Sequence, residues 1–212
     1  MNRIATAAAF VAALALAGTA AAALEPWTFV GTGVTCPVVS TYGNGVLHLE
    51  KNCSTETVAA AGASITGMGG QTFSSGSFTL ASPSQCQGGS PRFNVVTTDG
   101  TFFLGCNNVT PTINGDGTAT YEFTPAAIAA AGNQVPFPTG TITGIDVLID
   151  VEGTADLSAI TVNGTVEVPV TGPTAKSQCK NGGWQSFTSP SFRNQGQCVA
   201  WYEHQRSAPN GR

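Results

Sequence analysis

The stretch PRFNVVTTDGTFFLGC, residues 91–106, predicts a β-hairpin. Asp99-Gly100 suits a two-residue type I′ turn, because both positions tolerate positive φ angles. A loop of that length places Phe93 opposite Cys106 across the hairpin. Side chains alternate along a strand with period two, so one face carries the inward residues of both strands: Phe93, Val95, Thr97, Phe102, Leu104 and Cys106. Turn and alternation agree, which indicates a sheet with one face against a core.

Short strand-like segments recur on both sides of this hairpin. Strands are predicted at 27–30, 38–42, 46–50, 78–80, 118–124 and 141–151. Residues 54–77 are rich in Gly, Ser, Ala and Thr, which predicts a loop with one short strand near Ile65. The apolar residues of 160–170 share one parity, which predicts one long strand kinked at Gly164 rather than a hairpin there. Pro169 marks a sheet edge in this interpretation.

One short helix is predicted, over residues 124–132. Thr124 caps its start, Pro125 fits the first turn, and Gly132 ends it. Many short strands and few helices predict an all-β fold. The expected architecture is a disulfide-stabilised β-sandwich of jelly-roll type.

The composition agrees with an exported domain. Charged residues make up 9% of the chain, against about 25% in ordinary soluble domains. An apolar, alanine-rich stretch follows Arg3 and ends in small residues, which predicts a signal peptide over residues 1–23. The apolar run is shorter than the roughly 20 residues that span a bilayer. We therefore expect a secreted, extracellular protein without a transmembrane segment.

The chain has six cysteines, and all of them follow this signal. An even number in an oxidising compartment predicts three disulfides, although six cysteines allow many pairings. Pairing of neighbours would close three loops of similar length, each worth roughly 3 kcal/mol in the chain-entropy model. We favour it: Cys36–Cys53, Cys86–Cys106 and Cys179–Cys198. The close CxxC or HxxxH spacing of a metal site is absent, so neither a metal nor a cofactor is expected.

A change in charge predicts a domain boundary near Pro173. Residues 24–173 carry two basic and eleven acidic side chains, a net charge of −9, whereas residues 174–212 have a net charge of +4. The first range is expected to form the sandwich and the second a small cationic tail. The tail is too short to hold a core alone, so a disulfide would gather its aromatic residues: Trp184, Phe187 and Phe192.

The tail contains CKNGGW at 179–184 and FRNQGQCV at 192–199. These segments resemble the C-terminal signature CKxGGW…F[KR]NQGxCV of uncharacterised exported proteins of actinobacterial type. The body also looks like β-sandwich domains of such proteins, and residues 144–164 are similar to the closing strands of carbohydrate-binding jelly rolls. That family has no agreed activity, so the resemblance implies export and a β-sandwich but no particular reaction.

No catalytic residue is expected. A Ser nucleophile elbow, an HExxH helix and a Gly-rich phosphate loop are absent from the sequence. Acidic residues between Asp146 and Asp156 invite a glycosidase interpretation, since such enzymes need two carboxyl groups. They recur at alternate positions of one strand, which favours a solvated outer face instead. His48 is interpreted as a half-exposed strand residue.

The expected function is therefore that of a binding or envelope-associated protein and not of an enzyme. Its partner would be a polysaccharide or an anionic cell-envelope polymer, and no nucleic acid is expected. The cationic tail would bind such a polymer or dock on the acidic body, and both alternatives stay open. Exposed aromatic residues would serve as stacking platforms, unless each packs into the core: Trp27, Tyr42 and Trp184. A self-associating surface protein is the alternative, followed by a secreted hydrolase.

Overall fold

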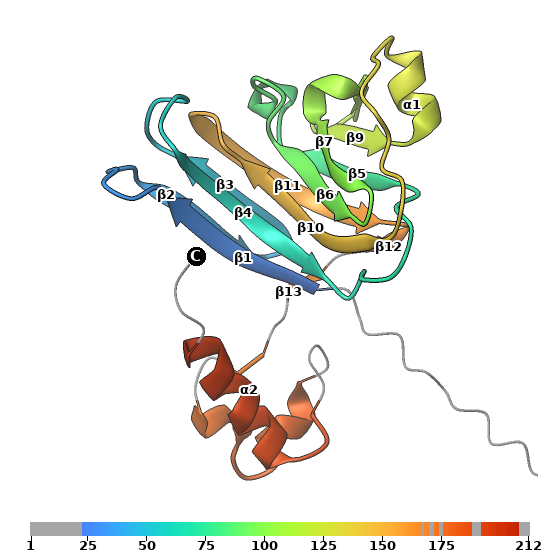
Figure 1. The fold of residues 1–212 in the computed structure, drawn as a ribbon. Coiled ribbons are helices and arrows are strands. Elements are labelled where there is room, and N and C mark those ends of the chain that lie inside the picture. The colour runs from blue at the N-terminus through green and yellow to red at the C-terminus, as the bar shows by residue number, and fades with distance from the viewer. Residues whose placement is uncertain (1–22, 167, 170–171, 174–175, 188–191, 208–212) are drawn as a thin grey trace, which may run out of the picture.

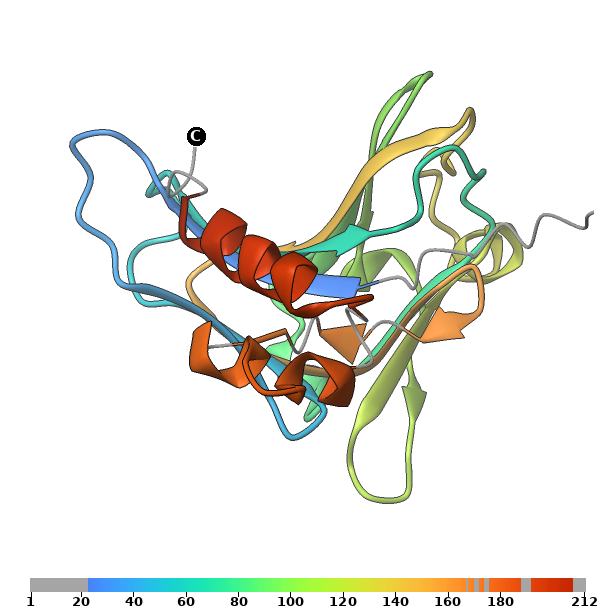
Figure 2. The same ribbon diagram turned by 90° about the horizontal axis from the view of Figure 1, so that it is seen from below.

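The computed structural model describes residues 23–166, 168–169, 172–173, 176–187 and 192–207. Two sheets pack face to face around a hydrophobic core, as Figure 1 and, from below, Figure 2 show. The all-β, disulfide-stabilised sandwich is thus confirmed, while the jelly-roll connectivity stays a prediction. The signal peptide predicted over 1–23 lies outside the described residues, apart from its last residue.

Sheet A has six strands, all antiparallel to their neighbours except for the parallel pair at one edge. In spatial order they are β13 (Val168–Pro169), β1 (Ala23–Val30), β4 (Ala59–Thr66), β10 (Ile142–Ile149), β6 (Arg92–Thr97) and β7 (Gly100–Gly105). Sheet B has seven strands. They are β2 (Val38–Gly43), β3 (Val46–Lys51), β11 (Gly153–Val162), β5 (Gly76–Leu80), β9 (Ala119–Phe123) and β8 (Thr112–Ile113), with β12 (Thr165–Val166) paired to β11.

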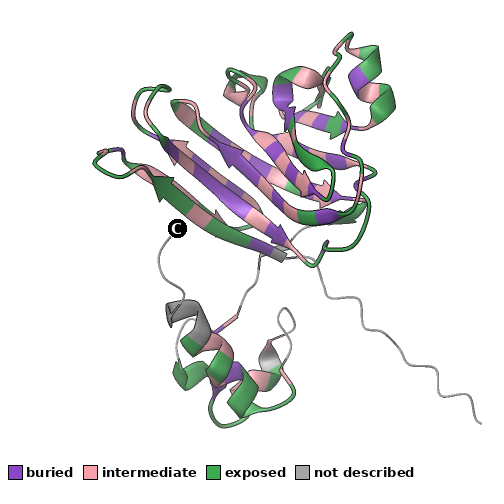
Figure 3. Cartoon of the chain, viewed as in Figure 1, coloured by how far each residue is buried: buried purple, intermediate pink, exposed green. Residues whose placement is uncertain are grey.

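The core between the sheets is aromatic at its centre. The ring of Phe78 in β5 lies 5.5 Å from that of Phe93 in β6 and 5.4 Å from that of Phe123 in β9, between centroids. Strands β3, β5 and β6 alternate buried and half-buried residues, as strands with one face on a core do. Figure 3 shows buried residues along β4, β10 and β6 and exposed residues along most of β1.

The helix and the disulfides agree with the sequence analysis. Helix α1 (Pro125–Ala130) starts at Thr124, whose hydroxyl accepts a hydrogen bond from the amide of Ala127 at 3.1 Å. Two short 3-10 turns, η1 (Pro83–Gln85) and η2 (Cys106–Asn108), flank the β6–β7 hairpin. All three neighbour pairings of cysteines are present: Cys36–Cys53, Cys86–Cys106 and Cys179–Cys198.

The predicted register of the β6–β7 hairpin is wrong by two residues. Phe93 pairs with Leu104 rather than with Cys106, and the loop is Thr98-Asp99 rather than Asp99-Gly100. A shift of two keeps every side chain on its predicted face, because the pleat has a period of two. The inward residues are therefore those expected, although their partners differ.

The turn of this hairpin is positioned by its neighbours and not by Gly100 alone. The amide of Asp99 donates to the Thr97 hydroxyl at 3.1 Å, and the amide of Thr98 donates to the carbonyl of Thr141 at 2.9 Å. The Thr139 hydroxyl donates to the Asp99 carboxylate at 2.8 Å. The contacts with Thr139 and Thr141 come from a segment at least 40 residues further along the chain, which a local turn rule does not include.

The prediction for residues 54–77 is confirmed only in part, because the short strand expected near Ile65 is the end of a longer strand, β4. Its inward residues are Ala59, Ala61, Ala63 and Ile65, and they are all buried. Small side chains allow sheet B to approach closely: the Ser40 hydroxyl of β2 donates to the carbonyl of Gly62 in β4 at 2.6 Å. Alanine and glycine have weak strand propensity, so packing decides this strand.

The long strand predicted over residues 160–170 is instead a hairpin followed by a change of sheet. Val162 of β11 pairs with Thr165 of β12, and the loop residues Asn163 and Gly164 have φ angles of 52° and 76°. Both are positive, as a type I′ turn requires. The chain then leaves sheet B, and β13 pairs with the start of β1 in sheet A. The prediction assumed one sheet for all these residues, although Pro169 does lie at an edge.

The described part of the tail forms three short elements. They are η3 (Lys176–Cys179), η4 (Gly183–Ser186) and helix α2 (Gln195–Ser207), and the bridge Cys179–Cys198 closes them. The ring of Phe192 lies 5.8 Å from that of Phe187 and 6.1 Å from that of Trp201 in α2. Helix α2 was not predicted, because Gly196 in its first turn and its mainly polar composition weaken the signal.

Candidate binding face on sheet A

The outward side of sheet A is built from alternate residues of five strands. Ser64 of β4 lies opposite Glu25 of β1 on one side and Asp146 of β10 on the other. Asn94 of β6 likewise lies between Asp146 and Phe103 of β7. We call this side the sheet A face and define it by eight residues: Glu25, Trp27, Ser64, Arg92, Asn94, Phe103, Asp146 and Asp150.

Trp27 is held in place at one end of this face. Its indole N–H donates to the Asp146 carboxylate at 3.1 Å, and the Ser64 hydroxyl donates to the same oxygen at 2.7 Å. Gly62 provides the space: a Cβ atom built there would lie only 2.7 Å from Cζ2 of Trp27. The indole of β1 therefore lies across β4 and reaches β10, in a fixed orientation.

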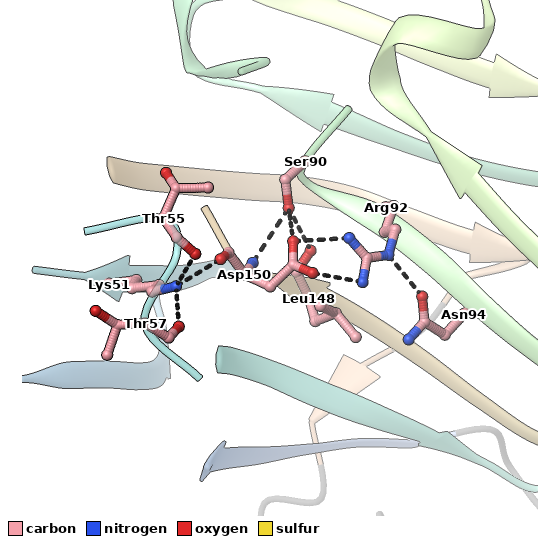
Figure 4. Close-up of polar contacts among 8 residues, drawn as sticks. All are labelled: Lys51, Thr55, Thr57, Ser90, Arg92, Asn94, Leu148 and Asp150. Atoms are coloured by element: carbon pink, nitrogen blue, oxygen red, sulfur yellow. Dashed lines mark hydrogen bonds and ion pairs between the residues drawn. The ribbon is translucent and has the colours of Figure 1, made fainter. Parts of the chain in front are cut away.

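Arg92 organises the other end of the face, as Figure 4 shows. Its two terminal nitrogens donate to the two Asp150 carboxylate oxygens at 2.7 and 2.6 Å, and its Nε donates to the Asn94 side chain at 2.8 Å. The guanidinium lies over the ring of Phe103, 5.5 Å from its centroid. Phe103 itself is 55% exposed. A bidentate pair and a stacked ring thus fix the plane of the guanidinium.

Two hollows flank these groups. One, of about 400 Å³, lies beside Arg92 and Phe103, and glycine backbone forms part of its wall at Gly89 and Gly105. A Cβ atom on Gly105 would lie 2.4 Å from the Gly89 carbonyl oxygen, so the two segments pack backbone to backbone. The other hollow, of about 330 Å³, lies beside Ser64 and Asp146. The face thus combines flat and concave surface with a small number of oriented polar groups, as ligand sites do.

The Asp150 carboxyl has a shifted pKa. Burial raises the pKa, but the hydrogen bonds and the charge of Arg92, together with a hydrogen bond from Ser90, outweigh it. The net result is a pKa below the ordinary value of 3.8. The Ser90 hydroxyl lies 3.3 Å from the carboxylate and 3.4 Å from the carbonyl of Leu148, so it links both.

The lowered pKa predicts an acid-dependent loss of stability. A carboxyl whose pKa is lower in the folded state stabilises the fold above the ordinary pKa, and this contribution is lost as the pH falls through the folded value. We expect the unfolding temperature of Asp150→Asn to fall less steeply than that of the wild type between about pH 5 and about pH 3. Glu122→Gln, which removes an exposed carboxylate in β9 of the other sheet, is the matched control. Parallel curves for wild type and Asp150→Asn would contradict the prediction.

Lys51 is a buried residue next to Asp150, at the end of the core between the two sheets. It is only 1% exposed, and its ammonium donates to the carbonyl oxygens of Thr55, Thr57 and Asp150 at 3.0, 2.7 and 2.7 Å (Figure 4). Asp150 therefore joins the two sheets, since its side chain binds Arg92 of β6 and its backbone binds Lys51 of β3. No carboxylate forms an ion pair with Lys51 in the described part of the chain.

The structure separates the three aromatic residues proposed from the sequence. Trp27 lies on the sheet A face, whereas Tyr42 of β2 is half-buried against the core of the sandwich. Trp184 is half-buried in η4 of the tail. Only the first of them belongs to an arrangement with polar groups around a hollow.

The outer face expected for the acidic residues is confirmed for Asp146 and Asp150, which lie on the outward side of sheet A, whereas the single strand expected for all of them is wrong. Asp146 and Asp150 are half-buried and bonded as described above, and Asp156 of β11 lies on the other sheet. There the Asp156 carboxylate accepts a hydrogen bond from Gln85 at 2.9 Å and lies 2.7 Å from Nδ1 of His48. His48 is 37% exposed in its side chain, as expected for a half-exposed strand residue.

Sequence reasoning missed Arg92, Asn94 and Phe103 as members of the face. The sequence does contain a signal for them, because the alternation of residues 91–106 places all three on the outward side of the hairpin. What the sequence did not show is which strand lies next to this hairpin. The neighbour is β10, and it places Asp146 beside Asn94.

Comparisons of this chain with protein-family models, curated proteins and solved structures gave no match. Among the residues that the structure describes, no helix is long and apolar enough to cross a membrane. Nor do three or more His, Cys, Asp or Glu side chains gather there as potential metal ligands. The sheet A face is therefore interpreted from its own geometry and charge.

Proposed function

We propose that this protein is a secreted, non-catalytic binding protein that holds a polysaccharide chain on the sheet A face. The observation that carries the proposal is the fixed indole of Trp27, which rests over Gly62 and is anchored by Asp146. A rigid aromatic surface loses little conformational entropy on binding, and its polar edge is already satisfied. Such a surface suits the flat, apolar side of a sugar ring.

The arrangement favours an extended ligand over a compact one. Trp27 lies in β1 and Phe103 in β7, and β4, β10 and β6 lie between these strands. Four strand spacings correspond to roughly 19 Å. Asn94 and Ser64 lie along this path and offer hydrogen-bonding groups between the two aromatic ends. A chain of several sugar residues would span the face, with one end near the hollow beside Arg92 and Phe103.

The positions of the acidic residues support a non-catalytic role. Asp146 and Asp150 are four residues apart along the chain, which corresponds to roughly 13 Å in a strand. Glycosidases hold their two carboxyl groups about 5 to 9.5 Å apart. Each of the two is also engaged by its own partners, Trp27 with Ser64 and Arg92 with Ser90.

Substitution of Trp27 tests the proposal. We expect wild-type protein to be retained on at least one of insoluble cellulose, chitin, xylan and mannan. Trp27→Ala should weaken that binding by about 30-fold, since loss of an aromatic anchor costs on the order of 2 kcal/mol. Trp27→Phe keeps a ring but loses the hydrogen bond to Asp146, so its affinity should lie between the two. Binding isotherms on the retained polymer measure these ratios.

Trp184→Ala provides the control, because it removes an equally large side chain outside the sheet A face. It should leave the affinity unchanged. Retention of wild type on none of the four polymers at low salt would reject the proposal. Equal losses for Trp27→Ala and Trp184→Ala would reject the sheet A face as the binding site.

A further inference from the structure

The charges on the sheet A face are unevenly balanced. Of its four charged residues, Arg92 is the only cation, and Asp150 engages it through both carboxylate oxygens. Asp146 accepts hydrogen bonds from neutral groups only, those of Trp27 and Ser64. Glu25 is exposed and lies in register with Ser64, on the same side. The face therefore has a net charge of −2 without an unpaired cation.

We infer that this face selects uncharged polysaccharides against acidic ones, an inference that rests on the proposed function. A ligand carboxylate would meet an Arg92 whose charge Asp150 already compensates and whose guanidinium already donates three of its five N–H groups to protein oxygens. It would also approach Glu25 and Asp146 with like charge. Like charges at a partly desolvated surface repel, and salt screens the effect.

The surroundings of Arg92 agree with an uncharged ligand. One side of the guanidinium is covered by Phe103, and Val135 contributes apolar surface to the adjacent hollow. The other lining groups there are glycine backbone and the side chains of Asn107 and Asn108, which are neutral. Neutral amide groups satisfy hydroxyl groups without favouring an anion.

Competition binding tests the selectivity on one polymer backbone. The full-length protein is first bound to the insoluble polymer. It is then displaced with a soluble ether of the same polymer, either the uncharged hydroxyethyl ether or the anionic carboxymethyl ether. For wild type at low salt, we expect displacement to need at least a tenfold higher concentration of the carboxymethyl ether than of the hydroxyethyl ether. The difference should narrow as salt is added.

Asp150→Asn converts the site, because it keeps the shape of the side chain and leaves the charge of Arg92 uncompensated. The carboxymethyl ether should displace this variant from the insoluble polymer at a concentration at least fivefold lower than that needed for wild type. Asp116→Asn is the matched control, because it makes the same charge change in an exposed turn outside the sheet A face. Its selectivity should equal that of wild type. Both variants keep the cationic tail, so its attraction for anionic polymers is the same in each.

Glu25→Gln is the second test, since Glu25 is exposed at a sheet edge and its change does not threaten the fold. It should also reduce the discrimination, by about twofold to threefold. Equal competition by the two ethers against wild type would overturn the inference while leaving polysaccharide binding intact. The inference would also be overturned if the folded single variants Asp150→Asn and Glu25→Gln both showed the selectivity of wild type. Failure of wild type to bind any polymer would instead reject the proposed function.

Discussion

Lys51→Met should lower the free energy of unfolding by about 3 kcal/mol. The lysine ammonium uses all three of its protons on backbone carbonyls, those of Thr55, Thr57 and Asp150. Methionine has a stem of similar length but no donor, so three carbonyl oxygens that converge on one point would lose their partner. An unsatisfied buried acceptor costs about 1 to 3 kcal/mol. Part of that cost is recovered here, because Thr55 is exposed and its carbonyl can accept from water.

Removal of a buried charge also brings a gain, since the desolvation of the ammonium is avoided. In this site the gain is small, because the three carbonyl dipoles already compensate the charge. The loss of hydrogen bonds should therefore dominate. It should be largest in the segment after Cys53, because Lys51 is what fastens Thr55 and Thr57 to the end of β10.

Denaturant unfolding of Lys51→Met and of Lys180→Met measures this contribution. Lys180 is exposed in the tail, so its substitution should change stability by no more than about 0.5 kcal/mol. Amide exchange in Lys51→Met should increase first around residues 54–58. If the two variants unfold at the same denaturant concentration, Lys51 does not hold the end of the sandwich.

The limits of the sequence-based prediction have physical causes. Phe93, Val95 and Leu104 were placed correctly on the inward face, because a period of two survives errors of register. The Thr98-Asp99 turn was missed because contacts from residues 139–141 position it. The end of β11 was missed because the chain changes sheet after β12. The alternation of residues within one segment shows which side chains share a face, but not which sheet the following residues join.

The candidate site was less accessible than the fold for the same reason. A face is made by strands that are distant in the chain: the indole of Trp27 and its acceptor Asp146 are 119 residues apart. Single residues were identified by type, as Trp27 was, but their grouping depends on the order β1-β4-β10-β6-β7. The second strand of that order is β4, most of which was missed because alanine and glycine give a weak strand signal.

Gly62→Ala should cost about 3 kcal/mol of stability and should abolish most of the polysaccharide binding. A Cβ atom at this position would lie 2.7 Å from three atoms: Cζ2 of Trp27, Cβ of Leu148 and the carbonyl oxygen of Val147. The first belongs to a side chain that can move away, at the expense of its hydrogen bond to Asp146. The carbonyl belongs to the ladder between β4 and β10, so it has little freedom to shift.

The double variant Trp27→Ala, Gly62→Ala separates these two effects. Removal of the indole relieves one clash but not the one with the Val147 carbonyl, so Gly62→Ala should remain destabilising in that background by at least about 1 kcal/mol. Gly115→Ala is the matched control, because a Cβ atom there meets nothing within 4 Å. Suppose that Gly62→Ala is as stable as Gly115→Ala and binds polysaccharide like wild type. The indole would then not rest on β4. The fixed aromatic surface would then be lost as the basis of the binding site.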